Sequence, residues 1–135
     1  MKELTIEAKI ENTAKVTAFL EEMLEEADCP MRTVMQISVA VDEVLTNIAS
    51  YAYPGSTGTS TVRAEIDEGA RRLELVFIDS GIPYNPLEAK EPDITLSAEE
   101  RQIGGLGIFM VRKLMDEVLY RREGEKNILT IHKAI

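Results

Sequence analysis

Two polar residues in an otherwise apolar run are the first candidates for chemistry in this chain. Glu43 and Asn47 are four residues apart, so a helix would bring both side chains to the same side. A carboxylate there can take a proton from a hydroxyl group or water, and a carboxamide oxygen is a hard ligand suited to Mg²⁺. A polar face on a surface helix explains the same pattern, because Glu-x-x-x-Asn is common by chance.

A second candidate is the segment Asp79-Ser80-Gly81, which follows the apolar run LELVFI. Asp79 ends a predicted buried strand, where its carboxylate can accept a hydrogen bond from an exocyclic amine such as that of adenine. Gly81 allows the backbone to approach a flat ring or to take a positive φ. Taken alone, an ordinary turn that closes a strand is the simpler explanation.

The third candidate is the glycine cluster Gly104-Gly105-Leu106-Gly107, which precedes an apolar helical pattern. Glycines there let backbone N–H groups converge on an anion, and the helix dipole adds a favourable partial charge. A flexible hinge with a helix cap is the alternative. No GxxxxGK[ST] sequence occurs, which excludes a Walker-type site. Together the three segments outline a nucleotide site with a metal-binding helix, a base-reading turn and a phosphate-binding helix N-terminus.

The periodicity of apolar residues predicts the elements that must position these segments. The expected elements are a strand over 4–10, helices over 13–27 and 30–50, a β-hairpin over 62–77, a helix over 107–116 and a closing hairpin over 118–133. The six methionines, including Met23, Met35, Met110 and Met115, fall at helical spacing and are expected in the core. The element order predicts an α+β two-layer sandwich, with helices on one face of a mixed, mostly antiparallel sheet.

Composition excludes several classes of function. The 135 residues suit a single domain, and an apolar content of 44% supports a sizeable core. Fifteen basic and 24 acidic residues give a net charge of −9, which argues against direct nucleic-acid or membrane binding. A bound polyphosphate would therefore need a metal ion, backbone N–H groups or a few basic residues.

Cysteine and histidine are too scarce for several other kinds of site. Cys29 cannot form an intrachain disulfide, and with the single histidine, His132, it cannot build a usual zinc site. His132, in a terminal strand, is expected to be packed or exposed rather than catalytic. No signal-type or membrane-spanning apolar run is present, so a cytoplasmic location is expected.

In this order the three segments resemble those of the GHKL ATPase superfamily, the Bergerat fold. The closest resemblance is to its small bacterial branch, the anti-sigma-factor serine/threonine kinases, and it covers residues 1–135 as one domain. Glu43 and Asn47 are similar to the N-box, Asp79–Gly81 to the first glycine box and Gly104–Gly107 to the second. The segment GGLGIFMVRKLMDEV is the most specific part of the resemblance.

The resemblance implies a role for each segment. Glu43 would be the general base and Asn47 would coordinate Mg²⁺. Asp79 would read the adenine amine of ATP or ADP, with Gly81 beneath the ring, and the second glycine box would hold the phosphates. Thr130 would support the adenine end through a water molecule. The irregular stretch 80–103, which contains three prolines, would be the ATP lid.

The resemblance also implies the partners. Members of this branch phosphorylate a serine on a small, STAS-type anti-anti-sigma protein and, in another state, sequester a sigma factor. The alternative is a nucleotide-dependent binding module without catalysis, and Glu43 favours the kinase because binding alone needs no base. One departure from the family lies in Ser50–Tyr53, where many relatives carry histidine. The oligomeric state, including a homodimer, is left open.

Overall fold

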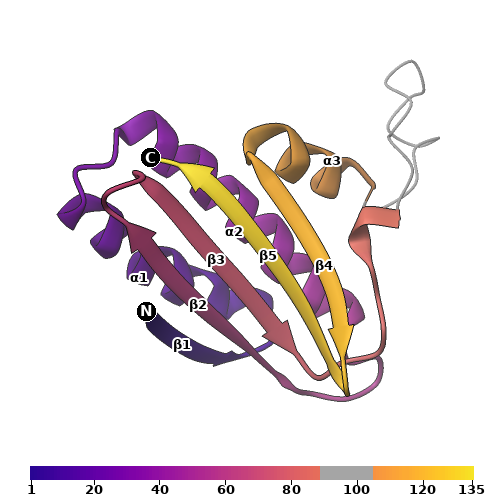
Figure 1. The fold of residues 1–135 in the computed structure, drawn as a ribbon. Helices are drawn as coiled ribbons and strands as arrows, with labels where there is room; N and C mark the ends of the chain where they lie inside the picture. Colours follow the sequence, from indigo (N-terminus) through magenta and orange to yellow (C-terminus); the bar gives the residue numbers. More distant parts are fainter. Residues whose placement is uncertain (89–104) are drawn as a thin grey trace.

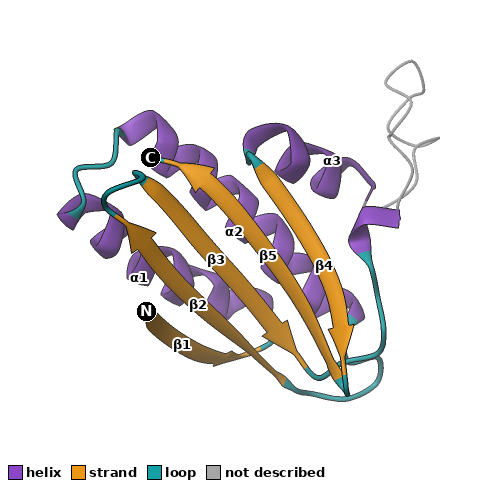
Figure 2. Cartoon of the chain, viewed as in Figure 1, coloured by secondary structure: helices purple, strands orange, loops and turns teal. Residues whose placement is uncertain are grey.

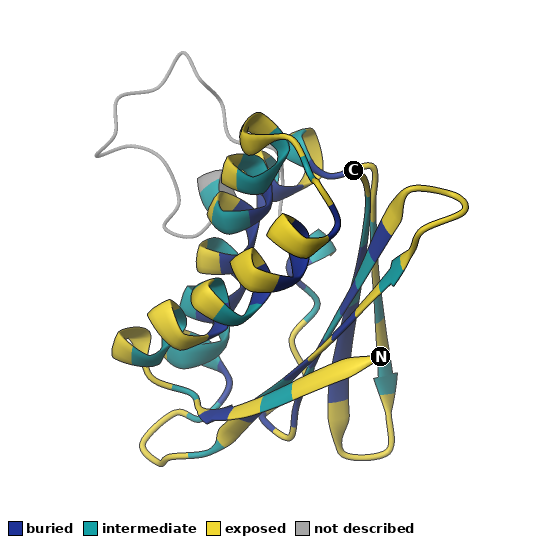
Figure 3. Ribbon diagram, turned by 90° about the vertical axis from the view of Figure 1, so that its left-hand side faces the viewer, coloured by how far each residue is buried: buried dark blue, intermediate teal, exposed yellow. Residues whose placement is uncertain are grey.

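The computed structural model describes residues 1–88 and 105–135. Figure 1 shows two layers, a sheet and a set of helices packed on one of its faces, and Figure 3 shows the same layers from the side. The elements in chain order are β1 (Lys2–Glu7), the 3₁₀ turn η1 (Ile10–Asn12), α1 (Thr13–Glu26), α2 (Met31–Tyr51), β2 (Thr59–Asp67), β3 (Arg72–Asp79), the 3₁₀ turn η2 (Pro86–Glu88), α3 (Gly105–Leu114), β4 (Glu117–Glu123) and β5 (Lys126–Ala134).

The five strands form one sheet in the order β1-β2-β3-β5-β4, and all four pairings are antiparallel (Figure 2). The α+β two-layer fold predicted from the sequence is confirmed. Strand β3 is central, and its residues alternate between the two faces of the sheet. Leu73, Leu75 and Phe77 are buried on the face that the helices cover, and Asp79 continues this row at the end of the strand. The alternation therefore turns a carboxylate inward beside the core.

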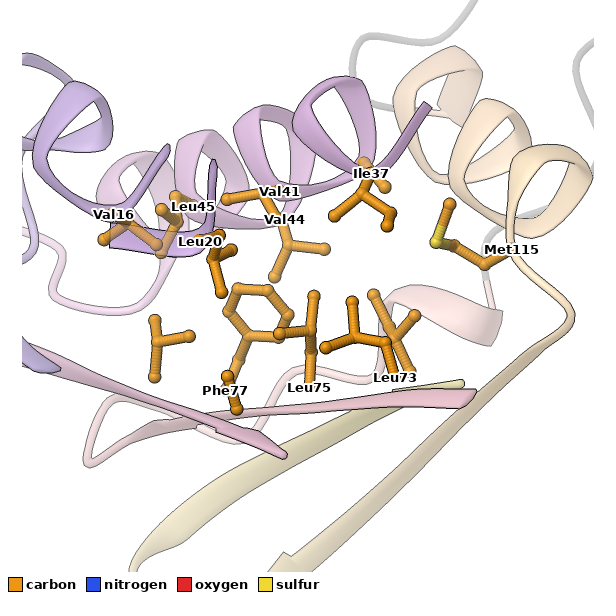
Figure 4. Packing of buried hydrophobic residues seen from close by; sticks show 14 of the residues in the cluster. Val16, Leu20, Ile37, Val41, Val44, Leu45, Leu73, Leu75, Phe77 and Met115 are labelled. Atoms are coloured by element: carbon orange, nitrogen blue, oxygen red, sulfur yellow. The ribbon is translucent and has the colours of Figure 1, made fainter. Parts of the chain in front are cut away.

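The core lies between this face of the sheet and helices α1 and α2 (Figure 4). Leu20 of α1, Val41 and Val44 of α2 and Phe77 of β3 are all nearly inaccessible to solvent. Two of the six methionines expected in the core, Met23 and Met115, are buried as predicted, with 8% and 5% of their surface exposed. The packed core provides a rigid platform for residues at the C-terminal ends of α2 and β3.

The other four methionines contradict this prediction, and Met1 and Met31 are 69% and 72% exposed. Met35 is 63% exposed and Met110 is 39% exposed. Each lies two residues from a fully packed neighbour, Ile37 or Ile108, and two helical residues are separated by about 200° around the axis. The strand predicted over 4–10 is also shorter than expected, because β1 ends at Glu7 and Ile10 lies in η1 with 60% of its surface exposed.

The single histidine lies on the sheet face that the helices do not cover. His132 Nδ1 is 2.6 Å from Glu117 Oε1, and His132 Nε2 is 2.8 Å from Glu74 Oε2. These glutamates are its direct partners across β4 and β5 and across β3 and β5. The histidine thus links three strands, away from the segments with candidate chemistry.

Most of the segment expected to form a lid lies outside the described residues, namely 89–103. The described part, Ser80–Glu88, includes the turn η2, in which Pro86 is buried. Among the helices that the structure describes, none combines the length and apolar character needed to cross a membrane.

Candidate nucleotide-binding site

A mostly apolar pocket lies where the C-terminal half of α2, the end of β3 and the β4–β5 hairpin meet. It holds about 460 Å³ of empty space, part of it open to solvent. Phe77, Ile108 and Leu129 are among its apolar walls, and Asn47 and Asp79 are among its polar groups. The structure thus brings together residues of the first two candidate segments, which are 32 positions apart in the sequence.

Among the described residues, the hydrogen-bond donors to Asp79 all meet one of its two carboxylate oxygen atoms. Its Oδ1 accepts hydrogen bonds from the backbone N–H of Gly81 and from Nδ2 of Asn127, both at 2.9 Å. The described residues donate no hydrogen bond to its other oxygen, Oδ2. The residue is only 6% exposed, so a carboxylate oxygen with spare capacity lines an apolar pocket. That arrangement suits an amine donor on a flat apolar ring.

Gly81 is required by the packing of the loop that follows β3. A Cβ at this position would overlap the carbonyl oxygen and the Cβ of Ala52, which follows α2. The backbone N–H of Ile82 donates to that same carbonyl oxygen at 2.9 Å. The loop therefore lies directly against the C-terminal end of α2, and glycine permits this approach. The position of Gly81 beneath an adenine ring stays a prediction.

Tyr53 fixes the same loop from the other side. Its hydroxyl group accepts a hydrogen bond from the N–H of Ser80 at 2.9 Å and donates one to the carbonyl of Thr59 at 2.6 Å. Burial raises the pKa of Tyr53, so the phenol keeps the proton that it donates. The side chain connects the end of α2, the start of β2 and the end of β3.

The third candidate segment meets the first at the start of α3. Glu43 of α2 is half-buried, and a Cβ at Gly107 would overlap its Oε2 atom. The carboxylate therefore lies directly against the first turn of α3, where helix N–H groups lack partners within the helix. Asn47 is one turn further along α2 and lines the pocket. Gly104 lies outside the described residues, and Gly105 and Leu106 are the first two residues of α3.

Sequence reasoning missed three residues of the β4–β5 hairpin. Asn127 contacts Asp79 directly, Tyr120 donates its hydroxyl proton to Asn127 Oδ1 at 2.6 Å, and Arg122 donates to the carbonyl of Gly81 at 2.8 Å. The available signal was an amide in line with Leu129 and Ile131, two buried apolar residues on the inward side of β5.

The structure does not bring Thr130 to this pocket. Thr130 pairs with Val76 and Leu119, and these residues occupy the face of the sheet opposite to Phe77. The residue of β5 that pairs with Asp79 is Asn127, which lies on the inward face. Because side chains alternate along a strand, a shift of three positions reverses the face. Asn127 therefore replaces Thr130 in the site considered below.

The fold and the meeting of these three segments define a nucleotide-binding domain of the histidine-kinase ATPase type. The family model described as histidine kinase-like ATPase domain matches residues 6–133, and the chain belongs to this family. The resemblance to GHKL ATPases is thereby confirmed.

Several relatives carry the names of protein kinases. The chain is 31% identical to the serine-protein kinase RsbW of Listeria monocytogenes, over 94% of its own length and 83% of that protein. It is 30% identical to the serine/threonine-protein kinase BtrW of Bordetella bronchiseptica. That match covers 70% of this chain and 66% of BtrW, so the chain spans just under two thirds of the length of this relative.

A solved structure shares the fold. It is the histidine kinase domain of a blue-light activated histidine kinase from Erythrobacter litoralis, with a TM-score of 0.57 and 25% sequence identity. The match covers 78% of this chain and 46% of that one. The likeness supports the two-layer architecture independently of the site residues.

Proposed function

We propose that this chain is an ATP-dependent serine/threonine protein kinase that acts as an anti-sigma factor. Its protein substrate is a STAS-type anti-anti-sigma protein, and its second partner is a sigma factor that it sequesters. The observation that carries the proposal is the contact of the Glu43 carboxylate with Gly107. A helix N-terminus is a common binding site for phosphate groups, so a carboxylate at this contact supports the role of Glu43 as the base. The names of the relatives support the choice of a serine as the acceptor.

The residues present fit an adenine nucleotide with a metal ion. The adenine amine donates to Asp79 Oδ2, and Phe77, Ile108 and Leu129 surround the ring. The start of α3 binds the phosphates through its backbone N–H groups. Asn47, a hard oxygen donor next to that helix start, would hold Mg²⁺, which neutralises phosphate charge and orients the transferring group. Such help is needed in a chain with a net charge of −9.

In the proposed reaction Glu43 acts on the hydroxyl group of the partner's serine. It accepts the hydroxyl proton while the serine oxygen bonds to the γ-phosphorus of ATP, and the bond from that phosphorus to the β,γ-bridging oxygen breaks. The products are phosphoserine, ADP and a protonated Glu43 that returns its proton to solvent. The partner can be tested directly by co-purification from the native host, incubation with labelled ATP and mapping of the phosphorylated residue. Recovery of no phosphorylated partner would contradict the kinase proposal.

Replacement of Asn47 with alanine should weaken binding of ATP with Mg²⁺ more than binding of metal-free ADP. The amide would matter most with the metal ion present, so we expect a loss of about tenfold or more with Mg²⁺ and a smaller loss without it. Titration calorimetry with and without Mg²⁺ measures both affinities. Ser50→Ala, one turn along the same helix at an exposed position, is the matched control. An equal loss under both conditions would make Asn47 structural.

Replacement of Gly107 with alanine should displace Glu43, because the new methyl group overlaps its carboxylate. Glu43 is flexible, and alanine is a better helix former by about 1 kcal/mol, so the fold should persist. We expect the rate of phosphotransfer to fall at least tenfold while adenosine binding is unchanged, since adenosine lacks the phosphates that lie near this contact. Gly69→Ala, in the β2–β3 turn, adds a methyl group with only ordinary contacts and serves as the control. A variant with the wild-type transfer rate would show that the contact is not functional.

A further inference from the structure

Asn127 has no hydrogen-bonding capacity left for a ligand. Its Nδ2 donates to Asp79 Oδ1 at 2.9 Å and to the carbonyl of Ile82 at 2.8 Å. Its Oδ1 accepts from the hydroxyl of Tyr120 at 2.6 Å and from the N–H of Tyr84 at 3.3 Å. A carboxamide offers two donors and two acceptor positions, and all four are used. The residue is 6% exposed, so water does not compete strongly for these bonds.

The partners also fix which end of the amide faces Asp79. If the oxygen and nitrogen atoms were exchanged, the oxygen would face two acceptors, Asp79 Oδ1 and the carbonyl of Ile82. The nitrogen would then face the N–H of Tyr84, which is itself a donor. Three of the four bonds would be lost, and buried polar groups without partners cost roughly 1–3 kcal/mol each. Asn127 therefore always presents a donor to Asp79.

That donor decides which oxygen of Asp79 can meet a ligand. Oδ1 is occupied by Asn127 and by the N–H of Gly81, so the carboxyl group cannot turn without losing both bonds. Oδ2 accepts no hydrogen bond from the described residues and remains as an acceptor of Asp79, which lines the pocket. A purine with a 6-amino group supplies the matching donor. A purine with a 6-oxo group places an acceptor against an acceptor, which is unfavourable.

We propose that Asn127 is a positioning residue that sets the selectivity of this site for 6-aminopurine over 6-oxopurine nucleotides. It also lines the pocket, but it acts through Asp79, because it has no hydrogen bond to spare for the base. The inference rests on the proposed ATP site and adds to it the group that fixes the orientation of Asp79. Without the Asn127 donor, the N–H of Gly81 alone holds the Asp79 carboxyl group, which can then turn more easily or carry a proton on Oδ2 toward a 6-oxo base.

Arg122 provides a way to separate this role from general support of the loop. Its guanidinium donates to the carbonyl of Gly81 at 2.8 Å, so it holds the same loop as Asn127. It makes no hydrogen bond to Asp79 in the described residues. Loss of the Arg122 contact should therefore loosen the loop while leaving the donor to Asp79 Oδ1 in place.

The test compares ADP with inosine diphosphate, which differs only in its 6-oxo base. Calorimetry gives both dissociation constants for the wild type and for Asn127→Ala, Tyr120→Phe and Arg122→Met. We expect the wild type to prefer ADP by about 10²-fold, since a site built around one hydrogen bond rejects the mismatched group strongly. Asn127→Ala should lower this ratio by about tenfold and Tyr120→Phe by about threefold. Arg122→Met should weaken both nucleotides by a similar factor and keep the ratio.

The possible results distinguish the role of Asn127 from the existence of the nucleotide site. If Asn127→Ala folds but keeps the wild-type ratio, Asn127 has only a structural role and the inference is overturned. If Asn127→Ala does not fold, Tyr120→Phe decides, and an unchanged ratio overturns the inference. A wild type that binds ADP and inosine diphosphate equally well also overturns it, while the proposed nucleotide site stands. A wild type that binds neither nucleotide removes the proposed function itself, and this inference with it.

Discussion

Glu43→Gln should abolish phosphorylation of the partner's serine and leave ATP binding intact. Glutamine keeps the size and the hydrogen-bonding atoms of the side chain but removes the basic carboxylate, so the substitution isolates proton transfer from the fold. Loss of a general base typically lowers a rate by on the order of 10²–10⁴-fold. The contact with Gly107 places this carboxylate at the start of α3, where we expect the phosphates.

A labelled-ATP assay with the partner from the native host measures this loss, and calorimetry measures nucleotide affinity in parallel. Asp42→Asn is the matched control, because it makes the same chemical change at the neighbouring residue, which is exposed. Full activity in Glu43→Gln would remove the assigned role. If the wild type captures its partner tightly and transfers no phosphate, the chain is a non-catalytic binding module.

The second large effect is expected at Asp79. Asp79→Ala removes the acceptor for the adenine amine and leaves the Asn127 and Gly81 donors without their shared partner. A hydrogen bond to a charged group is worth about 1.5–3 kcal/mol, so ADP affinity should fall by on the order of 10- to 100-fold. Asp79→Asn, which keeps the volume, should show a similar loss because its amide cannot satisfy both the donors and the base.

Calorimetry of ADP binding, with circular dichroism to verify folding, measures the effect. Ser80→Ala is a suitable control, since Ser80 is the exposed neighbour of Asp79 and only its backbone N–H takes part in the described contacts. Equal affinities for ADP in the wild type and a folded Asp79→Ala would place the adenine site elsewhere.

Local patterns were sufficient to predict most elements of this fold. The alternation in β2 and β3 and the helical spacing in α2 follow from one buried face each, so they can be read from consecutive residues. The same holds for Glu43 and Asn47, because residues four apart on one helix share a side whatever the tertiary structure. The strand that ends in Asp79 could be placed for the same reason.

The neighbourhood of Asp79 could not be predicted in this way. Asn127 is 48 residues away in sequence and meets Asp79 only because β5 lies between β3 and β4. Alternation shows that a strand has two faces, and it does not show which strand lies beside it. The family resemblance pointed to Thr130 instead, three positions along β5 and on the opposite face. When a residue is placed wrongly by an odd number of positions along a strand, its side chain is assigned to the wrong face of the sheet.

The sheet order also sets when this site can exist during synthesis of the chain. Strand β5 comes after β1 to β4 in the sequence, yet it pairs with β3 in the interior of the sheet. Until β5 arrives, β3 has an open edge, Asp79 lacks Asn127, and β4 has no partner strand. Pairing of distant strands is slow, and an open edge invites association with other chains. The pairing of β5 with β3 and β4 therefore completes both the sheet and the proposed nucleotide site. Nucleotide binding by a nascent chain would show that this pairing has taken place.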